Sequence, residues 1–192
     1  RGIVMENGRV VFDGGIEESI ENYLENEDST AHRIWTKDDK NRPKSDFLKM
    51  IEVKVLNSKR EISINHSIYQ SVCVEFVYEI VKEGEIFTHG FNLFNVENIH
   101  ILSSHDKESS TLKKPLGIGI HRKSVIIPGN LLSEGSYSCS FAIMRYSPFH
   151  IEFHEMDIVS FNIIDEFGDK TVRGNYSGHY PGLIRPELEW KN

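Results

Sequence analysis

Nine histidines give the chain many candidate metal ligands. The densest group is the run His150-Ile-Glu-Phe-His154-Glu155. Zinc proteases place two histidines one helical turn apart in the pattern His-Glu-x-x-His, usually with further ligands nearby. This run lacks that pattern, has no cysteine beside it and favours an extended backbone. We therefore expect no metal site and interpret the histidines as scattered surface residues.

Hydrolytic chemistry has two further candidates in the sequence. Glycoside hydrolysis needs paired carboxylates in a cleft, and Asp157, Asp165 and Glu166 are available. Solvated strand ends explain these acids better. A serine nucleophile is expected in a Gly-x-Ser-x-Gly turn, which the run Gly174-Asn-Tyr-Ser-Gly178 is not. We therefore expect no catalytic residue in this chain.

Composition narrows the remaining classes of function. The chain has 192 residues, of which 39% are hydrophobic, enough for one sizeable core. The net charge of -7 opposes binding to nucleic-acid phosphates. No apolar run approaches the ~18 residues that span a membrane, and the start does not resemble a signal peptide. Two cysteines are too few for a disulfide framework and fit a reducing compartment. Since the chain opens with Arg1, we expect it to be a piece of a longer protein.

The elements that must position any site are mostly strands. Short segments with alternating or apolar residues are separated by turn residues such as Asn57-Ser58, Glu83-Gly84 and Pro128-Gly129-Asn130. About seven strands at this spacing predict an all-β antiparallel sandwich. The predicted strands are 48–56, 71–81, 86–96, 99–103, 120–127, 136–146 and 157–165. The polar stretch 104–115 is predicted to be a mobile loop.

The sandwich is predicted to be immunoglobulin-like. The segment Ser133–Cys139 resembles a tyrosine corner, in which a Tyr, here Tyr137, ties its hydroxyl to the preceding turn. The two cysteines invite comparison with the disulfide of that fold. However, Cys139 shares its register with inward residues such as Tyr137, whereas Cys73 shares its register with Glu75. The two sulfurs should face different directions, so we expect no disulfide bond.

The first 46 residues do not continue the pattern of strands separated by turns. Ile3–Met5 and Val10–Phe12 are predicted to form a hairpin through the turn Asn7-Gly8, followed by a short helix over 16–24. Residues 25–46 are polar and are interpreted as a linker, in which Trp35 is the exception. The predicted domains are therefore a hairpin-helix remnant (1–24), a linker (25–46) and a β-sandwich (47–192).

The hairpin and helix resemble the tail of an ABC-transporter ATPase domain. The resemblance rests on Ile3-Val4-Met5, Val10-Val11-Phe12, Asp13-Gly14 and the helix ending at Tyr23. The phosphate-binding loop Gly-x-x-x-x-Gly-Lys-[Ser/Thr] of that domain does not occur in this chain. ATP and magnesium would therefore belong to a missing ATPase domain, and we expect no cofactor here.

An ATPase tail, a linker and a β-sandwich in this order resemble the ATP-binding subunit of O-antigen and related polysaccharide exporters, the Wzt type. Three local patterns agree with that family. They are Ile126 to Tyr137 with its Pro-Gly-Asn turn, Val159-x-Phe161-x-Ile163, and the Gly-rich end from Gly174 to Trp190.

This resemblance implies several expectations. The sandwich would bind the O-antigen polysaccharide, lipid-linked at the cytoplasmic face of the inner membrane, before export. Members of the family are homodimers that can exchange their C-terminal segments. The full exporter includes a transmembrane permease, so the chain would be cytoplasmic and peripheral to the membrane. Because the glycan varies among members, no binding residue is carried over.

A carbohydrate-binding face can nevertheless be predicted from strand register. If strands 86–96, 136–146 and 157–165 are neighbours, small and polar side chains share one outer face and form a platform with Tyr146 at its end. Plain exposure of a polar sheet face to water explains the same pattern. His89 facing outward would change the register of its strand. The candidate carbohydrate-binding residues are Thr88, Asn92, Ser138, Ser140, Tyr146, Ser160 and Asn162, and Ile158 is also expected to face outward.

The function expected from the sequence is therefore recognition of O-antigen polysaccharide coupled to export by an ABC transporter. The alternative is a structural module that only dimerises the ATPase subunits. A glycan-modifying enzyme on the same scaffold is a third hypothesis.

Overall fold

The computed structural model describes residues 1–6, 9–16, 18–19, 30–106, 114–165, 168 and 170–191. These residues form three sheets, with strand orders β1-β2, β5-β11-β10-β7-β8 and β3-β4-β6-β9. The strands are β1 (Gly2–Glu6), β2 (Arg9–Gly14), β3 (His32–Ile34), β4 (Leu48–Leu56), β5 (Asn65–Ser67), β6 (Val72–Ile80), β7 (Thr88–Asn95), β8 (His100–His105), β9 (Gly119–Ile127), β10 (Gly135–Tyr146) and β11 (Phe149–Ile164).

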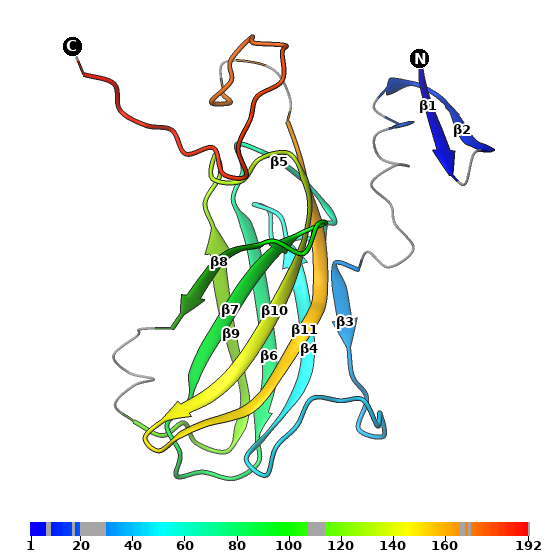
Figure 1. Cartoon of the computed structure of the whole chain (residues 1–192). Coiled ribbons are helices and arrows are strands. Elements are labelled where there is room, and N and C mark those ends of the chain that lie inside the picture. Colours follow the sequence, from blue (N-terminus) through cyan, green and yellow to red (C-terminus); the bar gives the residue numbers. More distant parts are fainter. Residues whose placement is uncertain are drawn as a thin grey trace.

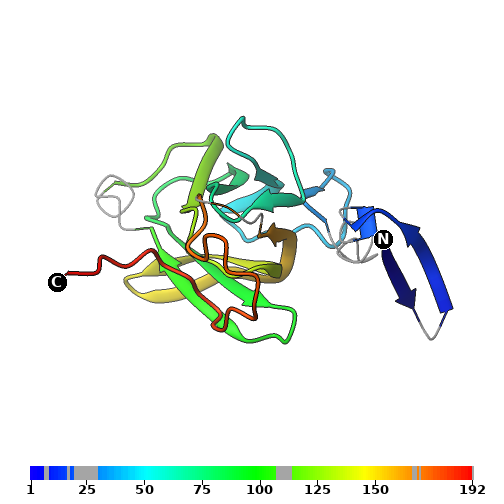
Figure 2. The same cartoon turned by 90° about the horizontal axis from the view of Figure 1, so that it is seen from above.

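The five-stranded and four-stranded sheets pack face to face as a β-sandwich (Figures 1 and 2). All pairings are antiparallel except the short one between β5 and β11. Alternate side chains of β6 and β10 enter the core between the sheets, where the Phe76 and Phe141 rings stack 3.7 Å apart. The predicted all-β sandwich is confirmed. No helix in the described part of the chain is long and apolar enough to cross a membrane.

The tyrosine corner and the separated cysteines are confirmed. The Tyr137 hydroxyl donates to the backbone oxygen of Ser133 (2.9 Å), which holds the turn before β10. Both cysteines are buried thiols without a disulfide. Cys139 lies in the core, whereas the Cys73 sulfur accepts a hydrogen bond from Arg60 (3.3 Å) on the outer side of its sheet. Burial raises the pKa of the Cys139 thiol.

The N-terminal hairpin is present as β1 and β2, and its Asn7-Gly8 turn lies outside the described residues. A helical turn follows at Ile16, where the backbone N–H of Ser19 donates to Gly15 (3.0 Å). The rest of the predicted helix also lies outside the described residues.

The described part of the predicted linker belongs to the sandwich. Within it, β3 pairs with β4, and Trp35 is buried in the core. Its backbone N–H donates to the Ile51 oxygen (2.9 Å). The packed domain therefore includes residues from about Thr30 onward.

Alternating charges cross the outer face of the four-stranded sheet. Glu75 on β6 pairs with Lys54 (3.2 Å) and with Arg60, and Lys54 also pairs with Glu52 (3.2 Å). The Glu75 side chain is almost fully buried. Burial by itself would raise the pKa of Glu75, but the hydrogen bonds and charges of Lys54 and Arg60 outweigh it and lower that pKa. The ionised form of Glu75 is therefore the one that stabilises the fold.

Glu75→Gln is expected to lower the free energy of unfolding by about 1–3 kcal/mol at pH 7, because it removes charged hydrogen bonds at a buried site. A carboxylate with a lowered folded pKa stabilises above its unfolded pKa, and that contribution is lost as pH falls below about 5. The difference between wild type and variant should therefore shrink at acidic pH in urea-unfolding measurements. Glu79→Gln on the same strand is the control. An equal difference at pH 7 and pH 3 would contradict this account.

Candidate functional site

The predicted platform is one face of the five-stranded sheet. Ser138, Ser140 and Met144 of β10 lie opposite Phe94, Asn92 and Thr88 of β7, so these side chains share a face. Ser138 also lies opposite Ser160 of β11. On β7, His89 points the other way, into the sandwich, where it contacts Tyr78. The register assumed for this strand is therefore correct.

Sharing a face does not make all of these residues accessible. Thr88, Ser140 and Asn162 are buried. The Asn162 amide donates to Asn65 Oδ1 of β5 (2.9 Å). Ser160 Oγ accepts a hydrogen bond from the backbone N–H of Thr30 (2.9 Å). The half of the platform on β11 is therefore occupied by the chain's own contacts.

A bulge in β11 explains part of this burial. Cys139 lies opposite Val159, but Phe141 lies opposite Glu155, so β11 carries two extra residues at this point. Asp157 in the bulge has a φ of 49°. The bulge places Met156 over Ser140, whose hydroxyl lies 3.3 Å from the Met156 sulfur. It also turns Ile158 into the core, so the expected outward position of Ile158 is wrong.

The accessible part of the face lies over β7, β8 and the end of β10. His105 lies opposite Gly90, and Ser103 lies opposite Asn92. The Tyr146 hydroxyl is 2.6 Å from His105 Nδ1, and Tyr146 is 49% exposed. We call the following side chains the outer row: Tyr146, His105, Asn92, Ser103, His100 and Phe94.

Hydrogen bonds hold the polar part of the outer row in place. Ser103 Oγ donates to Asn92 Oδ1 (2.6 Å). His100 Nε2 lies 3.1 Å from the backbone oxygen of Leu102, which can only accept, so this nitrogen carries the proton. The same nitrogen therefore donates to Ser103 Oγ (3.0 Å). The His100 ring also stacks on Phe94 with centroids 4.7 Å apart.

Sequence reasoning missed Ser103, His105, His100 and Phe94 as members of this face. The strand at 99–103 was expected, but residues 104–115 were assigned to a loop. In the structure β8 continues to His105, and residues 107–113 of that loop lie outside the described residues. The tight turn between β7 and β8, in which Asn98 N–H donates to Asn95 (2.9 Å), was the available signal, because it makes the two strands neighbours.

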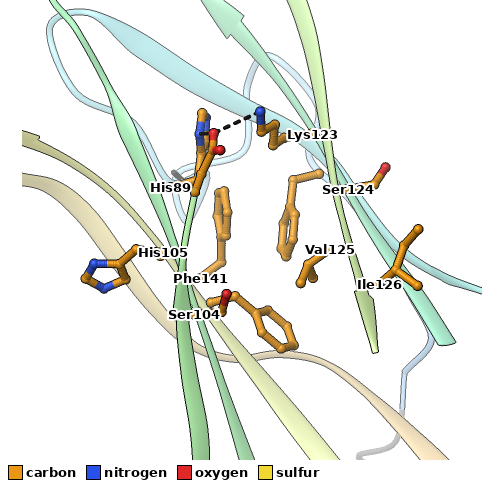
Figure 3. Close-up of a pocket in the computed structure, with 12 residues that line it drawn as sticks. His89, Ser104, His105, Lys123, Ser124, Val125, Ile126 and Phe141 are labelled. Carbon is orange, nitrogen blue, oxygen red and sulfur yellow. Dashed lines mark hydrogen bonds and ion pairs between the residues drawn. The ribbon is translucent and has the colours of Figure 1, made fainter. Parts of the chain in front are cut away.

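A cavity of about 220 Å³ lies inside the sandwich at its open edge. There β8 ends one sheet and β9 ends the other. Its floor is aromatic and includes Phe76, Phe91 and Phe141. Ser104 of β8 and Val125 of β9 line it from the two edge strands (Figure 3).

A fixed polar group closes one end of the cavity. The Asp106 carboxylate accepts hydrogen bonds from Lys123 Nζ (2.8 Å) and His89 Nδ1 (3.2 Å). Because the carboxylate only accepts, Nδ1 carries the proton, and His89 Nε2 accepts from the Tyr78 hydroxyl (2.8 Å). Burial lowers the pKa of His89 to about 4, although the hydrogen bond to Asp106 and the charge of Asp106 act to raise it. The His89 ring is therefore neutral at neutral pH. Burial likewise raises the pKa of Tyr78.

The run predicted not to bind metal lies at the start of β11, with His150 and His154 exposed. Across the described ranges, no three His, Cys, Asp or Glu side chains come together as a metal site.

Comparison with solved structures identifies the same fold elsewhere. The crystal structure of the C-terminal domain of wzt superposes with a TM-score of 0.61 and 12% sequence identity, covering 83% of this chain and 92% of that chain. The X-ray structure of Northeast Structural Genomics Consortium target SoR45 aligns with a TM-score of 0.29 and 11% identity over 77% of this chain and 98% of that chain. A TM-score this low supports no structural argument. Comparison with protein-family models and with curated proteins gave no match.

Proposed function

We propose that this chain is the glycan-recognition part of the ATP-binding subunit of a polysaccharide exporter, and that it binds the polysaccharide on the outer row. The observation that carries the proposal is the outer row itself, in which Asn92, Ser103 and His100 are held by mutual hydrogen bonds beside the exposed Tyr146. A saccharide presents hydroxyl groups and apolar C–H faces, which match such polar groups and an aromatic ring. A site fixed before binding loses less conformational freedom when the ligand arrives.

The fold supports the exporter context. The likeness to the C-terminal domain of wzt agrees with the resemblance of the sequence to Wzt-type subunits. On this proposal the ligand is O-antigen polysaccharide at the cytoplasmic face of the inner membrane, and binding precedes its transport by the permease. The chain acts by binding alone, without a catalytic residue or cofactor, while ATP and magnesium act in the ATPase domain.

Dimerisation is the second candidate function, and the C-terminal segment favours it. Residues 183–185 cross the turn before β10, where Arg185 N–H donates to Leu131 (2.7 Å). Beyond Pro186 the chain runs away from the sandwich (Figure 1). Its apolar residues Leu188 and Trp190 are 66% and 93% exposed. A second copy that exchanges this segment would cover such residues. A purely structural role would need the dimer but not the outer row.

Tyr146→Ala and Ser103→Trp are expected to weaken binding of the 192-residue chain to O-polysaccharide from its own strain by at least tenfold, about 1.4 kcal/mol. The first removes the stacking ring, and the second fills the surface beside Asn92. Isothermal titration calorimetry measures both. Tyr176→Ala, at an exposed tyrosine elsewhere, should bind like wild type.

Unchanged affinity in both outer-row variants would contradict this location of the site. A folded dimer that binds no form of the glycan would favour the structural role. Recovery of an unmodified glycan after long incubation argues against an enzyme, whereas a shortened or altered glycan would support one.

A further inference from the structure

We infer that the cavity between β8 and β9 is a second carbohydrate subsite, which takes one pyranose unit of a bound glycan. The inference rests on the proposed function for its ligand class, but its site is separate from the outer row. The cavity opens between the edge strands of the two sheets, whereas the outer row lies on the outer face of one sheet.

The walls of the cavity offer the two kinds of surface that a sugar ring needs. Phe91 and Phe141 provide an apolar floor for C–H groups. The Lys123 ammonium and Asp106 carboxylate stand at one end as a donor and an acceptor, and the Ser104 hydroxyl can do both. Because the charges of Lys123 and Asp106 offset each other, the site suits a neutral polyol better than an anion or a cation.

The polar end is preformed. His89 is almost fully buried, and its two ring nitrogens are bound by Asp106 and Tyr78, which fixes the carboxylate from behind. Lys123 fixes it from β9. The Asp106 carboxylate is therefore held by groups from both sheets, so the sheet edges keep their spacing and the cavity does not have to form during binding.

The size of the cavity limits its occupant. Its volume of about 220 Å³ is below the roughly 300 Å³ at which pockets for drug-sized ligands begin, so it suits one ring and not an oligosaccharide. His105 and Gly90 line the cavity and also belong to the face that carries the outer row. A glycan on the outer row can therefore place one unit, as a branch or a chain end, around the end of β8 into the cavity.

The test titrates the ¹⁵N-labelled 192-residue chain with methyl glycopyranosides of neutral hexoses, deoxyhexoses and N-acetylhexosamines. At least one is expected to shift the backbone amides of Ser104, Asp106, Lys123 and Ser124 saturably. Ser104→Trp, which fills the cavity from β8, and Lys123→Met, which removes the donor, should each weaken this binding at least tenfold. Ser58→Trp, in an exposed turn, and Arg122→Met, on the opposite face of β9, are the matched controls and should bind as wild type.

Absence of any saturable shift at these amides, or undiminished binding by Ser104→Trp and Lys123→Met, would overturn the inference. Polysaccharide binding, measured in parallel, distinguishes a failure of this inference from a failure of the proposed function. A chain that binds the polysaccharide but no glycoside in the cavity keeps the proposed function and loses the subsite. A chain that binds a glycoside in the cavity but no polysaccharide keeps the subsite and loses the proposed function.

Discussion

Asp165→Asn is expected to release the C-terminal segment from the sandwich, with a loss of about 3–5 kcal/mol, because removal of one partner leaves buried charges uncompensated. The Asp165 side chain is 1% exposed. Its Oδ2 atom accepts from Arg185 Nη1 (2.8 Å) and lies 3.0 Å from Arg173 Nε. Both guanidinium groups also lie over the Tyr180 ring. One carboxylate at the end of β11 therefore anchors two positions of the segment that follows.

Hydrogen exchange of residues 170–185 measures the release directly, and urea unfolding measures the global effect. Glu187→Gln removes an exposed carboxylate from the same segment and should change neither by more than about 0.5 kcal/mol. Protection of residues 170–185 in Asp165→Asn equal to that in wild type would show that this ion cluster does not hold the segment.

Phe141→Ala is expected to lower the free energy of unfolding by about 3–5 kcal/mol, because it leaves a cavity at the centre of the core. The Phe141 ring is 1% exposed and stacks on Phe76 across the two sheets. It also contacts the rings of Phe153 and His89, with centroids 6.4 and 6.0 Å away. The substitution therefore removes contacts to three elements at once.

Urea unfolding at pH 7 checks this value. Phe149→Ala, at a phenylalanine that is 65% exposed on the neighbouring strand, should cost no more than about 0.5 kcal/mol. A loss below about 1.5 kcal/mol for Phe141→Ala would mean that the core collapses around the gap and that the stacked pair is not central to it.

Much of the sandwich could be predicted because apolar and polar residues alternate regularly along its long strands. The prediction for 48–56 agrees with β4, and β6, β7, β9 and β10 begin and end within two residues of their predicted limits. The short strands β3 and β5 were missed, since three residues are too few to show a period of two. Their places are set by tertiary contacts, such as the pairing of Asn65 with Asn162.

The start of β11 was missed for a different reason. Apolar and polar residues do not alternate regularly over 149–156, where His150, His154 and Glu155 occur. The bulge at Asp157 then shifts the register of the strand. A bulge adds residues to one strand only, so it cannot be seen from that strand's own periodicity. The same bulge explains why Ile158 was placed on the wrong face.

The candidate site, like the fold, could be predicted only in part. Register predicted which side chains share the outer face, as the pairing of Ser140 with Asn92 shows. It could not predict that Met156 covers Ser140, because that depends on the bulge of a neighbouring strand. The cavity could not be predicted from the sequence either, because His89, Asp106 and Lys123 come together only when the two sheets pack.

The measurement that tests the central claim most directly is hydrogen exchange of the chain with and without O-polysaccharide from its own strain. The account predicts saturable binding and slowed exchange in β7, β8 and the end of β10, where the outer row lies, with no such effect from an unrelated polysaccharide. Saturable binding that leaves these strands unchanged, or no binding by the folded chain, would contradict it.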